Sequence, residues 1–199
     1  MKKKEPLIQV GILSHSEILF VLNGYYKASN NRFYTGKKVA VYRKGNILFD
    51  GDIMEDLSFE PTEDTCSFDL KNVIIGINFH WQRRENQRFK GALSFVVEGG
   101  KLTAVNKIKV EDYLTSVISS EMSATASEEL LKAHAVISRS WLLNPIMNKN
   151  KNKVRNVSVI REPERITRWY ERDAHTHYDV CADDHCQRYQ GISRASSKV

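Results

Sequence analysis

Two short segments contain the residues that could carry out chemistry. Glu121 stands within Ser119–Ala124 (SSEMSA), where small residues flank its carboxylate between two predicted helices. The second segment, His175–Gln190 (HTHYDVCADDHCQRYQ), brings several histidines close to a pair of cysteines. A carboxylate can donate or accept a proton, while thiolates and imidazoles are the ligands that zinc prefers. Together the segments predict a site with one acid/base carboxylate and a bound metal.

Two predicted helices position Glu121. Within Val110–Ser119 the apolar residues recur at helical spacing and share one face, and they are Val110, Tyr113, Leu114, Val117 and Ile118. Ser127 suits the N-cap of a second helix, and Asn144-Pro145 is predicted to end it, because proline disfavours a helical conformation in the residue before it. Glu121 is therefore expected in the intervening loop, where a substrate has room to approach.

The residues before the first helix predict a sheet. Residues 7–97 contain segments rich in Val, Ile and Phe that are separated by turn signals. The polar tract His80–Arg88 is predicted to be an exposed turn or edge, and a sugar-binding surface using Trp81 is the alternative. We therefore predict an α+β fold. A strand-rich N-terminal part, residues 1–97, packs beside a mixed helix/strand domain, residues 98–199, that carries the site.

Composition narrows the class of partner. The net charge of +6 permits an anionic partner, but Lys and Arg are spread along the chain without interleaved aromatic residues, which argues against nucleic acid. No apolar run reaches the length of about 20 residues that a transmembrane helix needs. The lysine-led start does not predict a signal peptide, because Glu5, Pro6 and Gln9 interrupt the apolar residues that follow.

The cysteine pair suggests a metal site. Cys181 and Cys186 are separated by four residues, and a short turn can bring such a pair together. With His175 they supply three ligands, and zinc sites with three protein ligands and one open position are usually catalytic. His177 is the closest substitute, whereas simultaneous ligation by His185 and its neighbour Cys186 is expected to strain the backbone. A disulfide and two free thiols are the alternatives.

The run from Phe89 to Leu143 resembles the sporulation stage II protein D/amidase-enhancer (SpoIID/LytB) domain. The matching motifs are Phe89-Lys90-Gly91, Val105-Asn106, Glu111-Asp112-Tyr113-Leu114, Ser120-Glu121-Met122, Leu131-Lys132-Ala133-His134-Ala135-Val136 and Arg139-Ser140-Trp141. The family usually has Gln where His134 stands and Tyr where Trp141 stands, which leaves the role of His134 open. The block from Asp179 to Tyr189 resembles the zinc-site variant of the same domain.

This resemblance implies a lytic transglycosylase that cleaves denuded peptidoglycan glycan strands to 1,6-anhydro-muramyl ends, with Glu121 as general acid/base. A single carboxylate suffices for such a cut, because the C6 hydroxyl of the muramyl sugar attacks the anomeric carbon and no water is activated. Ordinary glycosidases pair two carboxylates instead. Without the resemblance, an exposed loop residue or a salt-bridge partner would be the simpler interpretation of Glu121.

Four further residues are candidates for binding the sugar. Lys132 and Arg139 lie two turns apart on one helix face, so they could hold acetamido or carboxylate oxygens, or they could be plain surface charges. Gln187 and Tyr189 match the family's CQ-x-Y pattern and are predicted to point into the cleft. The alternative for these two is a strand with one buried face.

The family domain normally continues with further strands and a Gly-rich segment, whereas this chain stops at Val199. We therefore expect a truncated domain with an incomplete cleft. The two main functions that remain are a transglycosylase and a non-catalytic cell-wall-binding module that stimulates an amidase. A third is a zinc-dependent hydrolase in which Glu121 serves a metal-bound water. Because peptidoglycan lies outside the cytoplasmic membrane, we expect an extracytoplasmic location, in the periplasm or cell envelope.

Overall fold

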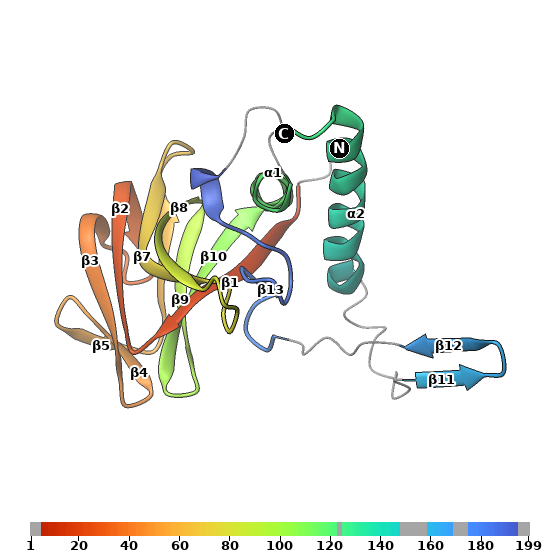
Figure 1. Ribbon diagram of the computed structural model, residues 1–199. Helices are drawn as coiled ribbons and strands as arrows, with labels where there is room; N and C mark the ends of the chain where they lie inside the picture. The colour runs from red at the N-terminus through yellow and green to blue at the C-terminus, as the bar shows by residue number, and fades with distance from the viewer. Residues whose placement is uncertain (1–4, 123–124, 148–158, 169–174, 195–199) are drawn as a thin grey trace.

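The strands of one large sheet dominate the fold, and two helices follow its first ten strands in the chain (Figure 1). A computed structural model describes residues 5–122, 125–147, 159–168 and 175–194. The sheet strands are β1 (Leu7–His15), β2 (Glu17–Ala28), β3 (Phe33–Arg43), β4 (Asn46–Phe49), β5 (Asp52–Met54), β6 (Leu57–Pro61), β7 (Ser67–Ile75), β8 (Arg83–Lys90), β9 (Ala92–Glu98), β10 (Lys101–Lys109) and β13 (Val180–Cys181). The other elements are α1 (Val110–Glu121), α2 (Glu128–Met147), the hairpin β11 (Val159–Glu162) and β12 (Arg165–Arg168), and the 3-10 turn η1 (Gly191–Ser193). The predicted α+β class is confirmed.

The sheet joins the two parts that the sequence analysis separated. Its main path runs β13-β1-β10-β9-β6-β2-β3-β4-β5, with β7 and β8 attached beside β2. Strand β1 pairs antiparallel with β10 and parallel with β13, so it lies between two strands from the other predicted part. Strands on both sides of the predicted boundary at residue 97 therefore belong to one sheet. Strand β8 pairs with β7 alone among the described strands, which places at an edge the polar tract His80–Arg88, most of which lies within β8.

Helix α1 lies between the sheet and α2 (Figure 1). All five apolar residues predicted to share one face of α1 are buried. Helix α2 begins after Ser127, whose Oγ accepts a hydrogen bond of 3.3 Å from the amide of Leu130, as expected of an N-cap. The predicted end at Asn144-Pro145 is wrong, because α2 continues to Met147. The bias of the residue before proline against a helical conformation is a preference and not a prohibition, and only Ile146 and Met147 follow Pro145 in α2.

Aromatic side chains form two parts of a continuous core. In the strand-rich part, the rings of Phe20, Phe49 and Phe59 pack at centroid separations of 5.3 to 6.3 Å. Below α1, the ring of Tyr189 packs 4.9 Å from Tyr113 and 5.6 Å from Phe89. These residues belong to one hydrophobic cluster. The segment that follows the cysteine pair is therefore anchored in the same core as the sheet.

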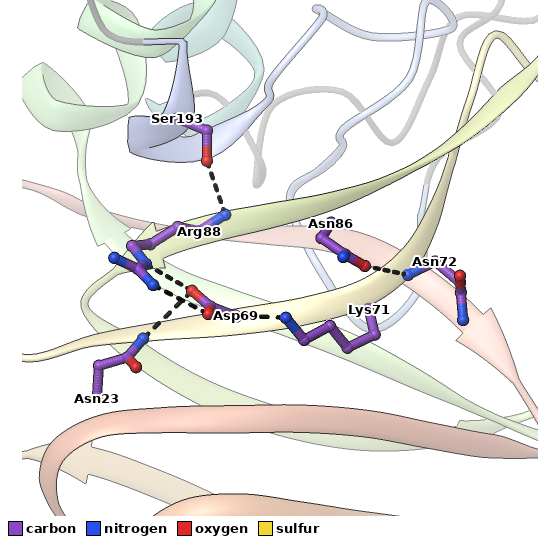
Figure 2. Close-up of polar contacts among 7 residues, drawn as sticks. All are labelled: Asn23, Asp69, Lys71, Asn72, Asn86, Arg88 and Ser193. Atoms are coloured by element: carbon purple, nitrogen blue, oxygen red, sulfur yellow. Dashed lines mark hydrogen bonds and ion pairs between the residues drawn. The ribbon is translucent and has the colours of Figure 1, made fainter.

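Polar contacts attach the end of this segment to β8 (Figure 2). The backbone N–H of Arg88 donates a 3.0 Å hydrogen bond to the hydroxyl of Ser193. The Arg88 guanidinium donates to both carboxylate oxygens of Asp69, at 2.6 and 3.1 Å, and this lowers the pKa of Asp69. Gly191 has a φ of +65°, and a Cβ there would lie 2.1 Å from the carbonyl oxygen of Arg88. Close approach of η1 to β8 therefore requires glycine at this position.

Asn106 connects the segment to the sheet from the other side. Its side chain is fully buried, and its Nδ2 donates to the carbonyl oxygens of Lys90 and Ala92, at 2.8 and 3.0 Å. Its Oδ1 accepts a 2.8 Å hydrogen bond from the hydroxyl of Tyr189. The family-like motifs around Lys90 and Asn106 thus serve the fold. Among the described helices, none is both long enough and apolar enough to cross a membrane.

Replacing Asn106 with alanine is expected to destabilise the protein by about 3 kcal/mol, because buried partners of its amide lose their hydrogen bonds. Asn86→Ala is the matched control, since Asn86 is exposed and its side chain accepts one hydrogen bond from the described residues, at 3.3 Å from the amide of Asn72 (Figure 2). It should change stability by less than about 0.5 kcal/mol. Urea unfolding of both variants measures the difference. Equal stabilities would contradict the role given to Asn106.

Candidate functional site

Glu121 is the last residue of α1, whereas the sequence analysis placed it in the following loop. Its side chain is 27% exposed, so one side of it remains open to a ligand. Both carboxylate oxygens are held: Oε1 accepts a 3.0 Å hydrogen bond from the backbone N–H of Arg188, and Oε2 lies 3.0 Å from Nε2 of His134. The end of α1, the second turn of α2 and the segment after the cysteine pair therefore meet at this carboxylate.

His134, whose role the sequence left open, lies against the Glu121 carboxylate. Its Nδ1 is buried and has no hydrogen-bond partner among the described residues, whereas Nε2 faces Glu121 and also lies 3.4 Å from the hydroxyl of Ser138. We assign the ring hydrogen of neutral His134 to Nε2 on this pattern. His134 then donates to Glu121 and fixes the direction of its carboxylate.

Arg188 is a site residue that the sequence analysis missed. Its backbone N–H holds Glu121, while its guanidinium donates to Oδ1 of Asp184 at 2.9 and 3.1 Å. The same guanidinium lies 5.0 Å from the ring centroid of Trp81, a cation–π contact. Arg188 therefore connects three regions that are far apart in the chain. No local sequence pattern marks a backbone amide as a ligand, so periodicity and motif spacing could not find it.

Four donor side chains gather beside this carboxylate-holding segment. They are His175, Cys181, His185 and Cys186, and their ligand atoms all lie within 4.8 Å of one another. His175 Nε2 lies 3.4 Å from Cys186 Sγ, and His185 Nδ1 lies 3.8 Å from Cys181 Sγ and 3.5 Å from Cys186 Sγ. The structure thus brings together the three ligands predicted from sequence and adds His185.

The inclusion of His185 differs from the sequence analysis, which set it aside and named His177 as the substitute. The backbone turns at this point, with the amide of Cys186 donating a 3.0 Å hydrogen bond to the carbonyl of Asp183. This turn lets the adjacent His185 and Cys186 side chains approach one another. His177 is exposed and is not a member of the cluster. The side chains of His185 and Cys186, whose joint ligation was expected to strain the backbone, therefore both reach the cluster.

The thiol of Cys181 differs from an ordinary thiol in its pKa. A hydrogen bond from the Cys186 side chain, assisted by the backbone of Asp183, lowers the pKa of Cys181 to about 5. The thiolate is the form that binds metals. Cys181, Cys186 and Cys66 are all free, so the disulfide alternative is not formed. The arrangement can therefore present two sulfur and two nitrogen donors to a soft cation.

Two residues predicted to bind sugar point into the protein instead. Gln187 is buried, accepts a 3.3 Å hydrogen bond from the Tyr113 hydroxyl and donates a 3.4 Å bond to the carbonyl of Ser138. Tyr189 is 1% exposed, and its hydroxyl donates to Asn106. Because their polar groups are satisfied internally, Gln187 and Tyr189 support the segment and do not contact a ligand through those groups.

The two predicted cations of α2 are also engaged elsewhere. Lys132 forms a 2.6 Å ion pair with Glu128 on an exposed face of α2. Arg139 pairs with Glu111 of α1, and both side chains are about half exposed. The structure therefore brings neither of them into the hydrogen-bond set of Glu121.

Comparison with known proteins places this site within a family. A profile described as Stage II sporulation protein (SpoIID) matches residues 98–199, which include Glu121 and the four clustered donors. The chain is also 36% identical over 130 residues to an uncharacterized protein from Brachyspira hyodysenteriae. That alignment covers 61% of this chain and 35% of the relative, so the chain spans only a minor part of the relative's length. No solved structure matches. Because the profile covers more than half of its residues, the chain belongs to the SpoIID family.

Proposed function

We propose that this chain acts on peptidoglycan as a lytic transglycosylase, with Glu121 as its single acid/base. Membership in the SpoIID family supports a role at the cell wall. The observation that carries the proposed activity is the environment of Glu121. Its partly exposed carboxylate lies at the end of α1 and is held in position by His134 and by the Arg188 amide. Such a group can exchange a proton with a bound substrate without losing its position.

The reaction needs two successive proton transfers through the same carboxylate. Glu121 first gives its proton to the glycosidic oxygen, and the bond from that oxygen to the anomeric carbon of the muramyl sugar breaks. The C6 hydroxyl of the same sugar then attacks the anomeric carbon, and its proton passes to the Glu121 carboxylate. No water is consumed, and the acid is restored. The donors on both oxygens stabilise the carboxylate in the step between the two transfers.

The substrate determines where this chemistry would occur. Peptidoglycan lies outside the cytoplasmic membrane, so we propose an extracytoplasmic location. The proposed substrate is the denuded glycan strand, which the resemblance to the SpoIID/LytB domain implies. Stimulation of a cell-wall amidase through binding alone is the competing function, and the first experiment below separates the two.

Glu121→Gln is expected to abolish anhydro-muramyl ends, because an amide cannot supply the proton to the leaving oxygen. Mass spectrometry of products from amidase-treated glycan strands measures this directly. A turnover loss of at least about 100-fold is expected. Strand binding by both proteins with no products from either would instead support the binding module. Reducing-end products that lack the anhydro bond would indicate hydrolysis.

His134→Leu is expected to lower turnover by about 100-fold, because the Glu121 carboxylate loses one of its two positioning donors. His134→Gln should retain turnover within about tenfold, since the glutamine amide can donate to the same oxygen. Initial rates on denuded strands measure both variants. Val136→Gln, at a position on α2 that is 66% exposed, is the control and should match the wild type. Equal loss in the glutamine and leucine variants would contradict this positioning role.

We further propose that the four clustered donors hold a zinc ion. With bonds of about 2.3 Å to sulfur and 2.0 Å to nitrogen, a tetrahedral ion separates those atoms by about 3.5 Å. The nitrogen–sulfur separations of 3.4, 3.5 and 3.8 Å fit this requirement. When bound by four protein ligands, zinc supplies a cross-link and keeps no open position for water. This supports a structural ion and disfavours the hydrolase that the sequence analysis left open.

The metal proposal predicts one zinc per chain, retained by His177→Ala and lost by Cys181→Ser and His185→Ala. Chelation should also lower the melting temperature of the wild type, because metal binding contributes to folding free energy. Elemental analysis of the purified proteins and thermal unfolding provide the readouts. Retention of zinc by both His185→Ala and His177→Ala would instead support the three ligands predicted from sequence, His175, Cys181 and Cys186. Loss of zinc from His177→Ala with retention by His185→Ala would support His177 as the substitute ligand.

A further inference from the structure

A cavity of about 670 Å³ opens beside the turn that carries the metal donors, residues 181–186, here called the metal turn. Cavities of this size typically hold small ligands. It lies against β1, β7 and β8, and Glu121 is not among its lining residues. Its apolar walls include Leu13, Val73, Ile75 and Tyr178, with Ile77 and Phe79 beside them. Ile77 and Phe79 are about half exposed, at 48% and 50%, so they form its mouth.

One polar side chain in this cavity has an unmet hydrogen-bonding need. Gln87, on β8, lines the cavity and is only 3% exposed. Its Oε1 is buried and accepts no hydrogen bond from any residue that the structure describes. A buried amide oxygen that accepts no hydrogen bond costs free energy, so such oxygens are usually satisfied. A ligand that places its own amide against Gln87 would satisfy it.

The charge of the lining excludes several ligand classes. Among the described residues, no Lys or Arg lines the cavity, which disfavours phosphate and peptide carboxylates. The two acidic side chains are engaged, because Asp183 accepts 3.2 Å hydrogen bonds from the amides of Gly76 and Ile77, and Asp184 pairs with Arg188. A neutral ligand with one amide and a small apolar group suits such walls. The acetamido group of an N-acetylated sugar has this composition.

The mouth of the cavity is built as a platform for a sugar ring. The ring of Phe79 stacks on Trp81 with centroids 5.3 Å apart and planes 17° apart. Trp81 in turn packs over Gly76, where a Cβ would lie 2.2 Å from the indole ring. The carboxylate of Asp183 holds this loop against the metal turn through the two amides named above. A half-exposed aromatic ring on a fixed support can pack against the apolar face of a sugar.

The platform and the acid share Arg188. Its guanidinium lies over Trp81 and pairs with Asp184 at the cavity wall, while its backbone N–H holds Glu121. A glycan strand at Glu121 therefore has a neighbouring aromatic surface and an amide-lined cavity along the same segment. We propose that this cavity is a subsite for the acetamido group of a sugar unit in the bound strand. The inference rests on the proposed function, since it assigns a specificity subsite to the same substrate.

The test compares binding of tri-N-acetylchitotriose with binding of its fully deacetylated trimer. Binding is measured by calorimetry on the metal-loaded full chain carrying Glu121→Gln, a substitution that prevents turnover. We expect the acetylated trimer to bind at least tenfold more tightly than the deacetylated one.

Gln87→Leu should lower the affinity for the acetylated trimer by about tenfold, as expected for one lost hydrogen bond. Phe79→Ala, at the exposed mouth, should weaken both trimers. Gln9→Leu, at an exposed β1 position outside the cavity lining, is the control and should bind like its parent.

Equal affinities for the two trimers would overturn the proposal, as would unchanged affinity in both Gln87→Leu and Phe79→Ala. Failure of the transglycosylase proposal has a different signature. In that case the wild type would form no anhydro ends, while discrimination between the trimers and its loss in Gln87→Leu would persist. Cleavage of strands without such discrimination would retain the enzyme and reject the subsite.

Discussion

The buried hydrogen bond from the Tyr189 hydroxyl to Asn106 determines where the candidate site lies. At 2.8 Å it attaches the segment after the metal turn to β10, and the Tyr189 ring packs against Tyr113 of α1. With Tyr189 directed into the core, the amide of the preceding residue, Arg188, points to Glu121. The orientation of the Glu121 carboxylate therefore depends on a contact that Tyr189 makes in the core.

A single short segment combines several tasks. The metal turn carries three of the four donors, Asp183 within it holds the loop that bears Trp81, and Arg188 just after it holds Glu121. Because these residues are neighbours in the chain, an ion that stiffens the turn would stiffen both the aromatic platform and the acid. A structural metal that does not touch the reacting bond would affect catalysis in this way.

Local patterns predicted the elements and the candidate site residues Glu121, Cys181 and Cys186, but not the partners that surround them. The helical spacing of Val110 to Ile118 and the cap at Ser127 depend on neighbouring residues, so the sequence sufficed for both. The end at Pro145 failed because a terminal turn tolerates one missing donor. The place of His185 in the cluster depends on a backbone turn. The role of Arg188 depends on a contact with Glu121, which lies 67 positions earlier in the chain. Gln187 and Tyr189 were assigned to the ligand because a motif does not reveal which way a side chain points.

Hydrogen exchange at the backbone N–H of Arg188 shows whether this group holds the Glu121 carboxylate in place. NMR of the metal-loaded chain should show slow exchange for Arg188, because its N–H is donated to Glu121 at 3.0 Å. In Glu121→Ala the exchange should accelerate at least tenfold, while the amide of Tyr189, which donates to the carbonyl of Ala182, should keep its protection. Equal exchange at Arg188 in both proteins would contradict the account.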